Sequence, residues 1–333
     1  MMKATIRKDG KVKVEDGLED LSLAETFFLL EREKIELFSD VGRKINLEKF
    51  FEIGSRLDSR LEIKCIVYRD LRERGYHVKH GLADFRLYPR GKKPGEGAAT
   101  RYVYAISERE PLPMKYILQK VKMINNIRKT MILAVVDEEG GMTYYSVKEA
   151  IFKPGERKVF ETKYIAHLVK DNVFLWDSPE RALNDLFEGG FYGKPFGGIL
   201  QLSLIESAYL LEKNIIRIVK GGEEISIDDF FAHCSDTMEN FSMIYGVYRD
   251  LRETGLIVKT GFKFGSHFRI YEKMDLMAFP HSRYLVHVFP IDHVFKIPDI
   301  SRAVRLANSV KKRMIFAGVG DAIEYIDITR IKL

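Results

Sequence analysis

The sequence predicts a tandem duplication of an α/β (α+β) unit, in which a small helical/β N-terminal subdomain is followed by a mixed α/β subdomain. Two long blocks recur in the same order. LSLAETFFLLEREKI from Leu21 returns as LSLIESAYLLEKNII from Leu202, and YRDLRERG from Tyr68 returns as YRDLRETG from Tyr248. The copies stay about 180 residues apart along the chain. This period is too long for a solenoid, so it indicates one ancestral unit that was duplicated. Two copies of one fold commonly pack as a fused pseudo-dimer.

The first half of each copy has helical patterns. In the second copy, Ser203 precedes an apolar stripe and Glu206 follows three residues later, which is typical of a capped helix start. The residues around Phe230 indicate a second, short helix, and the apolar spacing up to Leu251 indicates a third. Gly255 then supplies the left-handed residue that commonly ends a helix.

The second half of each copy mixes strands with one helix. In the second copy we expect a helix over residues 300–311, where apolar residues form a stripe at helical spacing. Apolar runs and alternation predict strands at residues 256–258, 268–271, 284–289, 313–317 and 323–328. Strands with one helix between them favour a small α/β or α+β domain.

The composition is that of a soluble globular chain with a mild basic excess. The chain has 333 residues, of which 46% are hydrophobic, and a formal net charge of +6. No apolar run is long enough to cross a membrane, and the first residues lack the apolar core of a signal peptide. The two cysteines, Cys65 and Cys234, argue against a disulfide framework, so we expect a cytoplasmic protein. The charge is compatible with a polyanionic partner.

Three residues of the second copy could carry chemistry. Tyr271 ends a predicted strand, His281 precedes the next strand, and Lys312 lies between the predicted helix and the strand that follows it. Side chains at element ends can converge on a cleft. Cleavage of RNA without a metal needs a base for the 2′-OH, positive charge beside the phosphorane and an acid for the leaving 5′-oxygen. Histidine transfers protons at neutral pH and lysine supplies fixed charge, so this trio suits that reaction.

The duplication supplies an internal comparison. Tyr88 and Lys129 of the first copy stand opposite Tyr271 and Lys312, but Ala99 stands opposite His281. A copy without the histidine cannot act as the acid. We therefore interpret the second copy as catalytic and the first as a retained scaffold.

Two other classes of protein compete with this interpretation. A metal-dependent nuclease is one, because His267, His281, His287 and His293 are close in sequence. Zinc sites, however, usually use Cys or carboxylate ligands at tighter spacing. A non-catalytic RNA-binding or scaffold protein is the other, and it does not explain why Tyr271, His281 and Lys312 occur together in one copy.

The run VKTGFKFGSHFRIY, followed by HSRYLVHV and SRAVRLANSVKKRMIFA, resembles the catalytic domain of archaeal tRNA-splicing endonucleases. The resemblance is to the type whose single chain holds two fused copies of the subunit, and it covers nearly the whole chain. It implies Tyr271 as general base, His281 as general acid and Lys312 as stabiliser of the transition state. It also implies cleavage of precursor tRNA at a bulge–helix–bulge motif, with no metal or cofactor, leaving a 2′,3′-cyclic phosphate and a 5′-hydroxyl.

The resemblance also implies binding and assembly residues. Arg305 resembles an arginine that stacks on a bulge base, and Arg330 is the most plausible second arginine of that sandwich. Asp137, Glu138 and Glu139 correspond to an acidic loop that docks into a basic cleft of a neighbouring unit, so we expect a homodimer. The alternatives are an exposed helix residue at 305 and an ordinary acidic hairpin tip at 137–139.

These observations divide the chain into five parts. We expect an N-terminal subdomain of repeat 1 at 1–62, a degenerate nuclease-like subdomain at 63–150, a linker at 151–186, an N-terminal subdomain of repeat 2 at 187–241, and a catalytic nuclease subdomain at 242–333.

Overall fold

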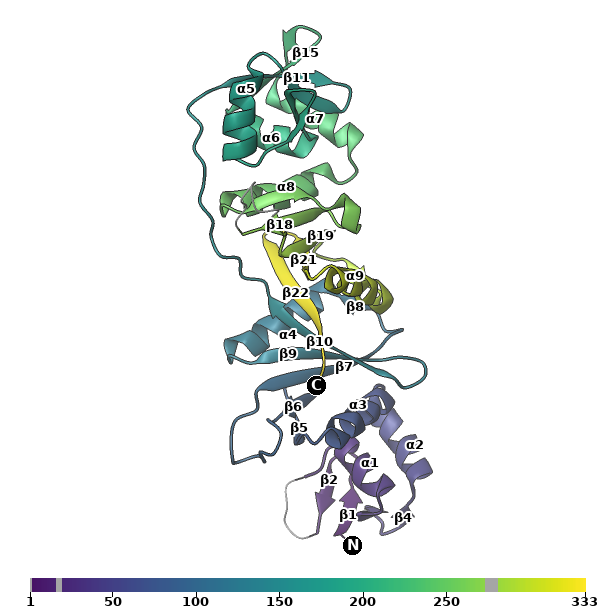
Figure 1. The fold of residues 1–333 in the computed structure, drawn as a ribbon. Helices are drawn as coiled ribbons and strands as arrows, with labels where there is room; N and C mark the ends of the chain where they lie inside the picture. Colours follow the sequence, from purple (N-terminus) through teal and green to yellow (C-terminus); the bar gives the residue numbers. More distant parts are fainter. Residues whose placement is uncertain (1, 16–19, 273–280) are drawn as a thin grey trace. The chain divides into compact units, whose positions relative to one another are not determined.

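The computed structural model describes residues 2–15, 20–272 and 281–333 (Figure 1). Its contacts divide the chain into two compact units. One unit comprises Met1–Glu149, Asp292–Asn308 and Ile326–Leu333, and the other comprises Ala150–Ile291 and Ser309–Tyr325. The units therefore do not coincide with the two sequence copies, because a helix and part of the last strand of the second copy belong to the first unit.

The first unit begins with a small sheet covered by helices. The sheet has the order β2-β1-β3-β4. Its elements are β1 (Met2–Ile6), β2 (Val12–Val14), α1 (Leu23–Glu31), β3 (Ile35–Ser39), β4 (Lys44–Ile45) and α2 (Leu47–Leu57).

The larger sheet of the first unit has the order β22-β10-β9-β7-β6-β5. Its elements from the first copy are α3 (Leu61–Glu73), β5 (Val78–His80), β6 (Phe85–Leu87), β7 (Arg101–Ser107), β8 (Leu112–Pro113), α4 (Met114–Asn126), β9 (Thr130–Val136) and β10 (Met142–Glu149). The second copy adds β20 (Val294–Phe295), α9 (Ile297–Ser309) and the end of β22 (Ile323–Ile331).

The two copies meet symmetrically within this unit. Strands β10 and β22 pair antiparallel, with Val147 opposite Ile328. These two residues occupy equivalent places, because each lies three residues after a tyrosine whose hydroxyl donates to a helix aspartate: Tyr144 in the first copy and Tyr325 in the second. Strands β8 and β20 pair in the same symmetrical way. The ladder has the self-complementary form of an isologous interface, which confirms the duplication.

The second unit repeats the first arrangement. Its small sheet has the order β13-β14-β12-β11-β15-β16. The elements are β11 (Tyr164–Val169), β12 (Asn172–Leu175), α5 (Pro179–Ala182), η1 (Leu183–Gly189), β13 (Lys194–Phe196), β14 (Ile199–Leu202), α6 (Leu204–Glu212), β15 (Ile216–Lys220), β16 (Glu223–Glu224) and α7 (Ile227–Thr237).

The remaining part of the second unit holds four strands in the order β17-β18-β19-β21. Its elements are α8 (Phe241–Glu253), β17 (Ile257–Thr260), η2 (Phe262–Phe264), β18 (Phe268–Tyr271), β19 (Tyr284–Pro290) and β21 (Arg313–Val319).

The local signals for helix ends are confirmed. Ser203 caps α6 and forms a complete capping box with Glu206. Gly255 follows α8 with a φ of +80°, the left-handed conformation that glycine adopts without strain.

The segment assigned to the linker, 151–186, differs from the expectation. Residues 151–163 contain no helix or strand, but β11, β12 and α5 follow them, so the second copy begins its folded part near Tyr164. The alternation of YIAHLV is the signal for this strand, since Tyr164, Ala166 and Leu168 are buried and the residues between them are not.

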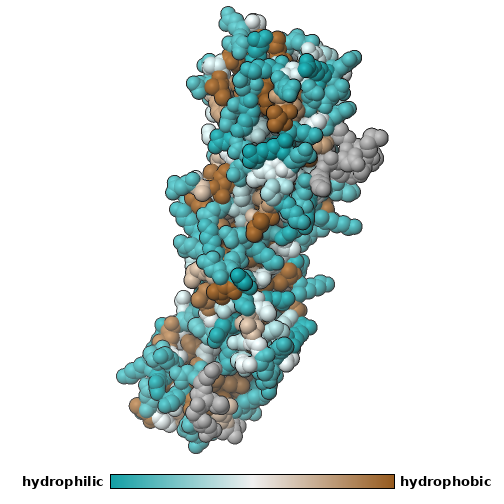
Figure 2. All heavy atoms as spheres, turned by 90° about the vertical axis from the view of Figure 1, so that its left-hand side faces the viewer, coloured by the Kyte–Doolittle hydropathy of each residue, from teal (hydrophilic) through white to brown (hydrophobic). Residues whose placement is uncertain are grey.

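Each unit has its own hydrophobic core. Phe50 and Tyr68 lie in the first core, and Phe230 and Tyr248 occupy the same sequence places in the second. The face drawn in Figure 2 is mostly hydrophilic, with apolar side chains in small separate patches. In the described part of the chain, no helix is both long enough and apolar enough to cross a membrane.

His267 and His287 of the second unit are partly buried, and the first copy has Asp84 and Tyr104 in their places. The Nδ1 atom of His267 accepts a hydrogen bond from the backbone of Val288 at 3.0 Å, as the Asp84 carboxylate does from Ala105 at 2.8 Å. The ring of His287 lies 5.8 Å from that of His267. Burial lowers the pKa of His267, and burial together with the nearby His267 lowers the pKa of His287 to about 4.

Because of these two histidines, we expect the folded chain to lose stability in mild acid. Because both pKa values are lower in the folded chain than in the unfolded chain, the unfolded chain binds more protons between about pH 6.5 and 4. The free energy of unfolding should therefore fall as the pH is lowered through this range, by up to about 1.4 kcal/mol per pH unit for each linked proton. Denaturant unfolding at a series of pH values measures this. His287→Tyr, which copies Tyr104 of the first copy, should flatten the dependence, and an unchanged slope would contradict the assignment.

Candidate active site

The pairing of three strands fixes the geometry of the site. Strand β18 runs antiparallel to β19, with Ile270 opposite Tyr284. Strand β19 runs parallel to β21, with Tyr284 opposite Arg313. The end of β18 and the starts of β19 and β21 therefore lie at one edge of the sheet.

The predicted trio lies at this edge. Tyr271 is the last residue of β18 and is 5% exposed. Lys312 directly precedes β21 and is 9% exposed, and its Nζ atom donates a hydrogen bond of 2.9 Å to the carbonyl oxygen of Ser282. His281, the neighbour of Ser282, is exposed to solvent. The register thus brings a phenol, an imidazole and an ammonium group to one sheet edge.

The environment of Lys312 is only partly polar. Its ammonium group lies 5.5 Å from the centre of the Phe264 ring. Burial lowers the pKa of Lys312, and the positive charge of Arg269 lowers it further. A partly desolvated ammonium group interacts more strongly with an approaching anion than one in water.

Arg269 is a second cation at this edge. Its guanidinium carbon lies 5.8 Å from the centre of the Tyr271 ring, and its buried Nε atom has no hydrogen-bond partner among the described residues. The sequence motifs did not single out Arg269 as part of the site. The signal for its position was the period of two along β18, which puts Arg269 and Tyr271 on the same face.

The first copy has the same strand register. Leu87 pairs with Arg101, and Arg101 pairs with Thr130. Arg101 therefore takes the place that Tyr284 has in the second copy. The corresponding edge is formed by the end of β6 and the starts of β7 and β9.

This register corrects one detail of the sequence comparison. Ala98, and not Ala99, stands in the place of His281. His281 lies three residues before Tyr284, and Ala98 lies three residues before Arg101, which has the same place in the strand pairing. The similar blocks TRYVYAI and SRYLVHV suggest a register one residue away. Both positions hold alanine, so the first copy keeps Tyr88 and Lys129 at this edge but lacks the imidazole.

The two predicted RNA-binding arginines belong to the first unit. Arg305 is exposed on α9, and Arg330 is exposed on β22 directly opposite Tyr145. Arg305 and Tyr145 line one small pocket. Tyr145 is thus a neighbour of both arginines.

The acidic residues form the turn between β9 and β10. Asp137 accepts hydrogen bonds from the backbone of Glu139 and Gly141, so its carboxylate shapes the turn itself. Glu138 pairs with Arg109 at the surface, with 2.9 Å from Nε to the carboxylate. The side chain of Glu139 has no hydrogen bond or ion pair within the described residues and is exposed.

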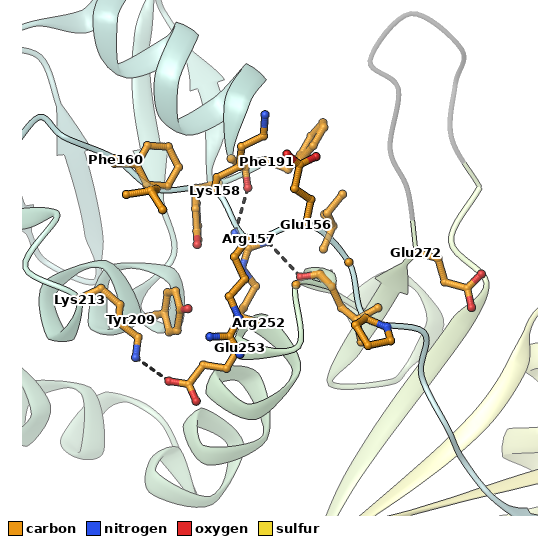
Figure 3. Close-up of a pocket in the computed structure, with 18 of the residues that line it drawn as sticks. Glu156, Arg157, Lys158, Phe160, Phe191, Tyr209, Lys213, Arg252, Glu253 and Glu272 are labelled. Atoms are coloured by element: carbon orange, nitrogen blue, oxygen red, sulfur yellow. Dashed lines mark hydrogen bonds and ion pairs between the residues drawn. The ribbon is translucent and has the colours of Figure 1, made fainter.

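A basic pocket of about 1180 Å³ lies in the second unit (Figure 3). It is lined by the extended segment 153–160, by α6, by the end of α8 and by His281. Its cations are Lys153, Arg157, Lys158, Lys213, Arg252 and Arg283, and its carboxylates are Glu156, Glu253 and Glu272. The pocket has an excess of positive charge because its cations outnumber its carboxylates. Two of the carboxylates are paired, Glu253 with Lys213 and Glu272 with Arg283.

The extended segment is held against α8 by its backbone. The N–H of Gly155 donates to the carbonyl oxygen of Thr254 at 2.8 Å. A Cβ atom on Gly155 would stand 2.1 Å from the carbonyl oxygen of Gly255, so a side chain does not fit. This contact fixes Arg157 and Lys158 on the wall of the pocket.

The histidines considered as metal ligands are arranged differently. His287 stacks on Phe316, and His293 packs against Phe295. Over residues 2–15, 20–272 and 281–333, no group of three or more His, Cys, Asp or Glu side chains is placed to hold a metal ion.

Two family models match parts of this chain. Residues 61–144 and residues 241–326 each match the family model described as tRNA intron endonuclease, catalytic C-terminal domain. Residues 164–231 match the tRNA intron endonuclease, N-terminal domain. The catalytic-domain match therefore occurs once in each copy.

Several archaeal proteins are similar over most of the chain. A tRNA-splicing endonuclease of Methanococcoides burtonii is 46% identical, over 95% of this chain and 91% of its own length. One from Methanosarcina acetivorans is 46% identical over 96% and 91%, and one from Haloferax volcanii is 31% identical over 95% and 91%. The chain belongs to the tRNA intron endonuclease family. It is an enzyme, an RNA endonuclease of the tRNA-intron lyase class.

Proposed function

We propose that this protein removes introns from precursor tRNA by cutting at bulge–helix–bulge motifs, through metal-independent attack of a ribose 2′-OH. Tyr271 accepts the proton of the 2′-OH, and the new bond between the 2′-oxygen and phosphorus forms as the bond from phosphorus to the 5′-oxygen breaks. His281 gives its proton to the departing 5′-oxygen. Lys312 stabilises the added negative charge of the phosphorane. The products are a 2′,3′-cyclic phosphate and a 5′-hydroxyl.

The observation that carries this proposal is the common sheet edge of the three residues. The hydrogen bond from Lys312 to Ser282 ties the ammonium group to the segment that holds His281. Arg269 adds a second positive charge beside Tyr271. The proposal assigns catalysis to residues 242–333, because the first copy has no imidazole at the equivalent edge.

The two copies provide matched variants. Tyr271→Phe and His281→Ala should lower the single-turnover rate of pre-tRNA cleavage by about 10²–10⁴-fold, because each removes a proton-transfer group. Lys312→Ala should lower it by about 10²–10³-fold, because it removes charge stabilisation. Tyr88→Phe and Lys129→Ala in the first copy should leave the rate near that of the wild type. Equal losses of rate from the first-copy and second-copy variants would contradict the assignment of catalysis to the second copy. A loss of wild-type activity in EDTA would contradict the metal-independent reaction.

We further propose that the protein acts as a homodimer, in which the acidic turn 137–139 of one chain enters the basic pocket of the other. The turn presents Glu138 and Glu139 to solvent. The pocket presents Arg157 and Lys158 on a segment that is held by backbone contacts. Complementary charge of this kind favours one docking arrangement over others.

Charge reversal tests this assembly. Glu138→Lys/Glu139→Lys should weaken the dimer by roughly tenfold or more, because like charges then face each other across the interface. Sedimentation velocity measures the shift toward monomer. Reversing the pocket with Arg157→Glu/Lys158→Glu in the same chain should restore the dimer.

The second unit offers a matched control for that variant. Glu223 and Glu224 are also consecutive and exposed, and Glu224 pairs with Arg217 as Glu138 does with Arg109. Reversing Glu223 and Glu224 should leave the dimer intact. A dimer that survives reversal of the acidic turn would rule out this docking.

A further inference from the structure

A second, smaller pocket of about 350 Å³ lies within the first unit. Helix α9 contributes Arg302 and Arg305, the β9–β10 hairpin contributes Thr143 and Tyr145, and the turn after β7 contributes Glu108. Its volume lies at the lower end of the range for small-molecule sites, which suits a single heterocyclic group.

The walls of this pocket come from different sequence copies. The helix belongs to the second copy, whereas Glu108, Thr143 and Tyr145 belong to the first. In the other copy, Ile291 takes the place of Glu108, and Ile326 takes the place of Tyr145. The polar wall is therefore specific to the first copy and is not a feature that both copies share.

The polar wall presents a hydrogen-bond acceptor. Glu108 is half-buried, and one of its carboxylate oxygens accepts the backbone N–H of Glu138 at 3.0 Å, which holds the group in place. The other oxygen has no hydrogen bond to any described residue, and neither does the hydroxyl of Thr143.

The helical wall presents a planar cation. Arg302 pairs with Asp299 at 3.5 Å on the same helix. The guanidinium of Arg305 forms no ion pair with a described residue and is exposed. One wall can therefore stack on a flat ring while the other accepts a hydrogen bond from its edge.

We propose that Glu108 reads the unpaired nucleobase that the family resemblance places against Arg305, by accepting a hydrogen bond from an exocyclic amino group of that base. This inference rests on the proposed function. A guanidinium plane stacks on a nucleobase, which suits Arg305. A carboxylate accepts from the amino group of cytosine or adenine, but the O4 atom of uracil would set one acceptor against another. Glu108 is thus a specificity-determining residue that disfavours uracil.

The test uses bulge–helix–bulge RNAs in which each unpaired base is changed from adenine to uracil, one position at a time. Single-turnover cleavage gives the preference in the active enzyme, and RNA affinity in the His281→Ala background gives it without cleavage. At one unpaired position the wild type should favour adenine by roughly tenfold. Glu108→Gln should abolish this preference, because the amide can donate to uracil and still accept the backbone N–H of Glu138. Glu110→Gln, an acid outside the pocket, should preserve the preference.

Two results would overturn the inference. One is equal cleavage and affinity for adenine and uracil at every unpaired position, and the other is a preference that Glu108→Gln leaves intact. If the wild type cuts none of these RNAs, the proposed function fails, yet the affinities in the His281→Ala background still decide whether the pocket distinguishes the two bases.

Discussion

The hydrogen-bond register of β18, β19 and β21 is the constraint on which the rest of the site depends. Antiparallel pairing of β18 with β19 and parallel pairing of β19 with β21 bring three element ends to one edge. Lys312 is separated from Tyr271 and His281 by a helix in the sequence, and the strand pairing brings all three residues to that edge. A slip of one residue would turn the side chains of a strand to the opposite face. The hydrogen bond from Lys312 to the carbonyl oxygen of Ser282 then links the start of β21 directly to the segment before β19.

Duplication explains why a chain with one complete trio keeps two copies of the fold. The β10–β22 ladder pairs equivalent residues, Val147 and Ile328, and both are fully buried. Removal of the first copy would leave that edge of β22 unpaired and its apolar residues exposed. The first copy therefore keeps this structural role although it has alanine in the place of His281. In our account it also supplies the acidic turn and Glu108, so it contributes to assembly and recognition while the second copy contributes the chemistry.

Local features of the fold were predictable from sequence, and long-range ones were not. Ser203 and Gly255 act on their own helix ends, so their residue types suffice to place them. The repeat showed that the two copies are equivalent. The exact register of β7, however, depends on its pairing with β6 and β9, and this register places Ala98, instead of Ala99, opposite His281. The membership of α9 in the first unit depends on contacts between distant segments and has no local signal. The partly buried position of Arg269 likewise follows from packing.

The central claim is that the 2′-OH of the substrate is the nucleophile, activated at the sheet edge of the second copy. A pre-tRNA with a single 2′-deoxynucleotide on the 5′ side of one splice site tests this directly, because it lacks only the attacking group. The account predicts that the wild-type enzyme leaves this site uncut while it still cuts the unmodified site in the same molecule. Cleavage at the deoxy site at a rate near that of the ribose form would contradict it, since the attacking oxygen would then have to come from water.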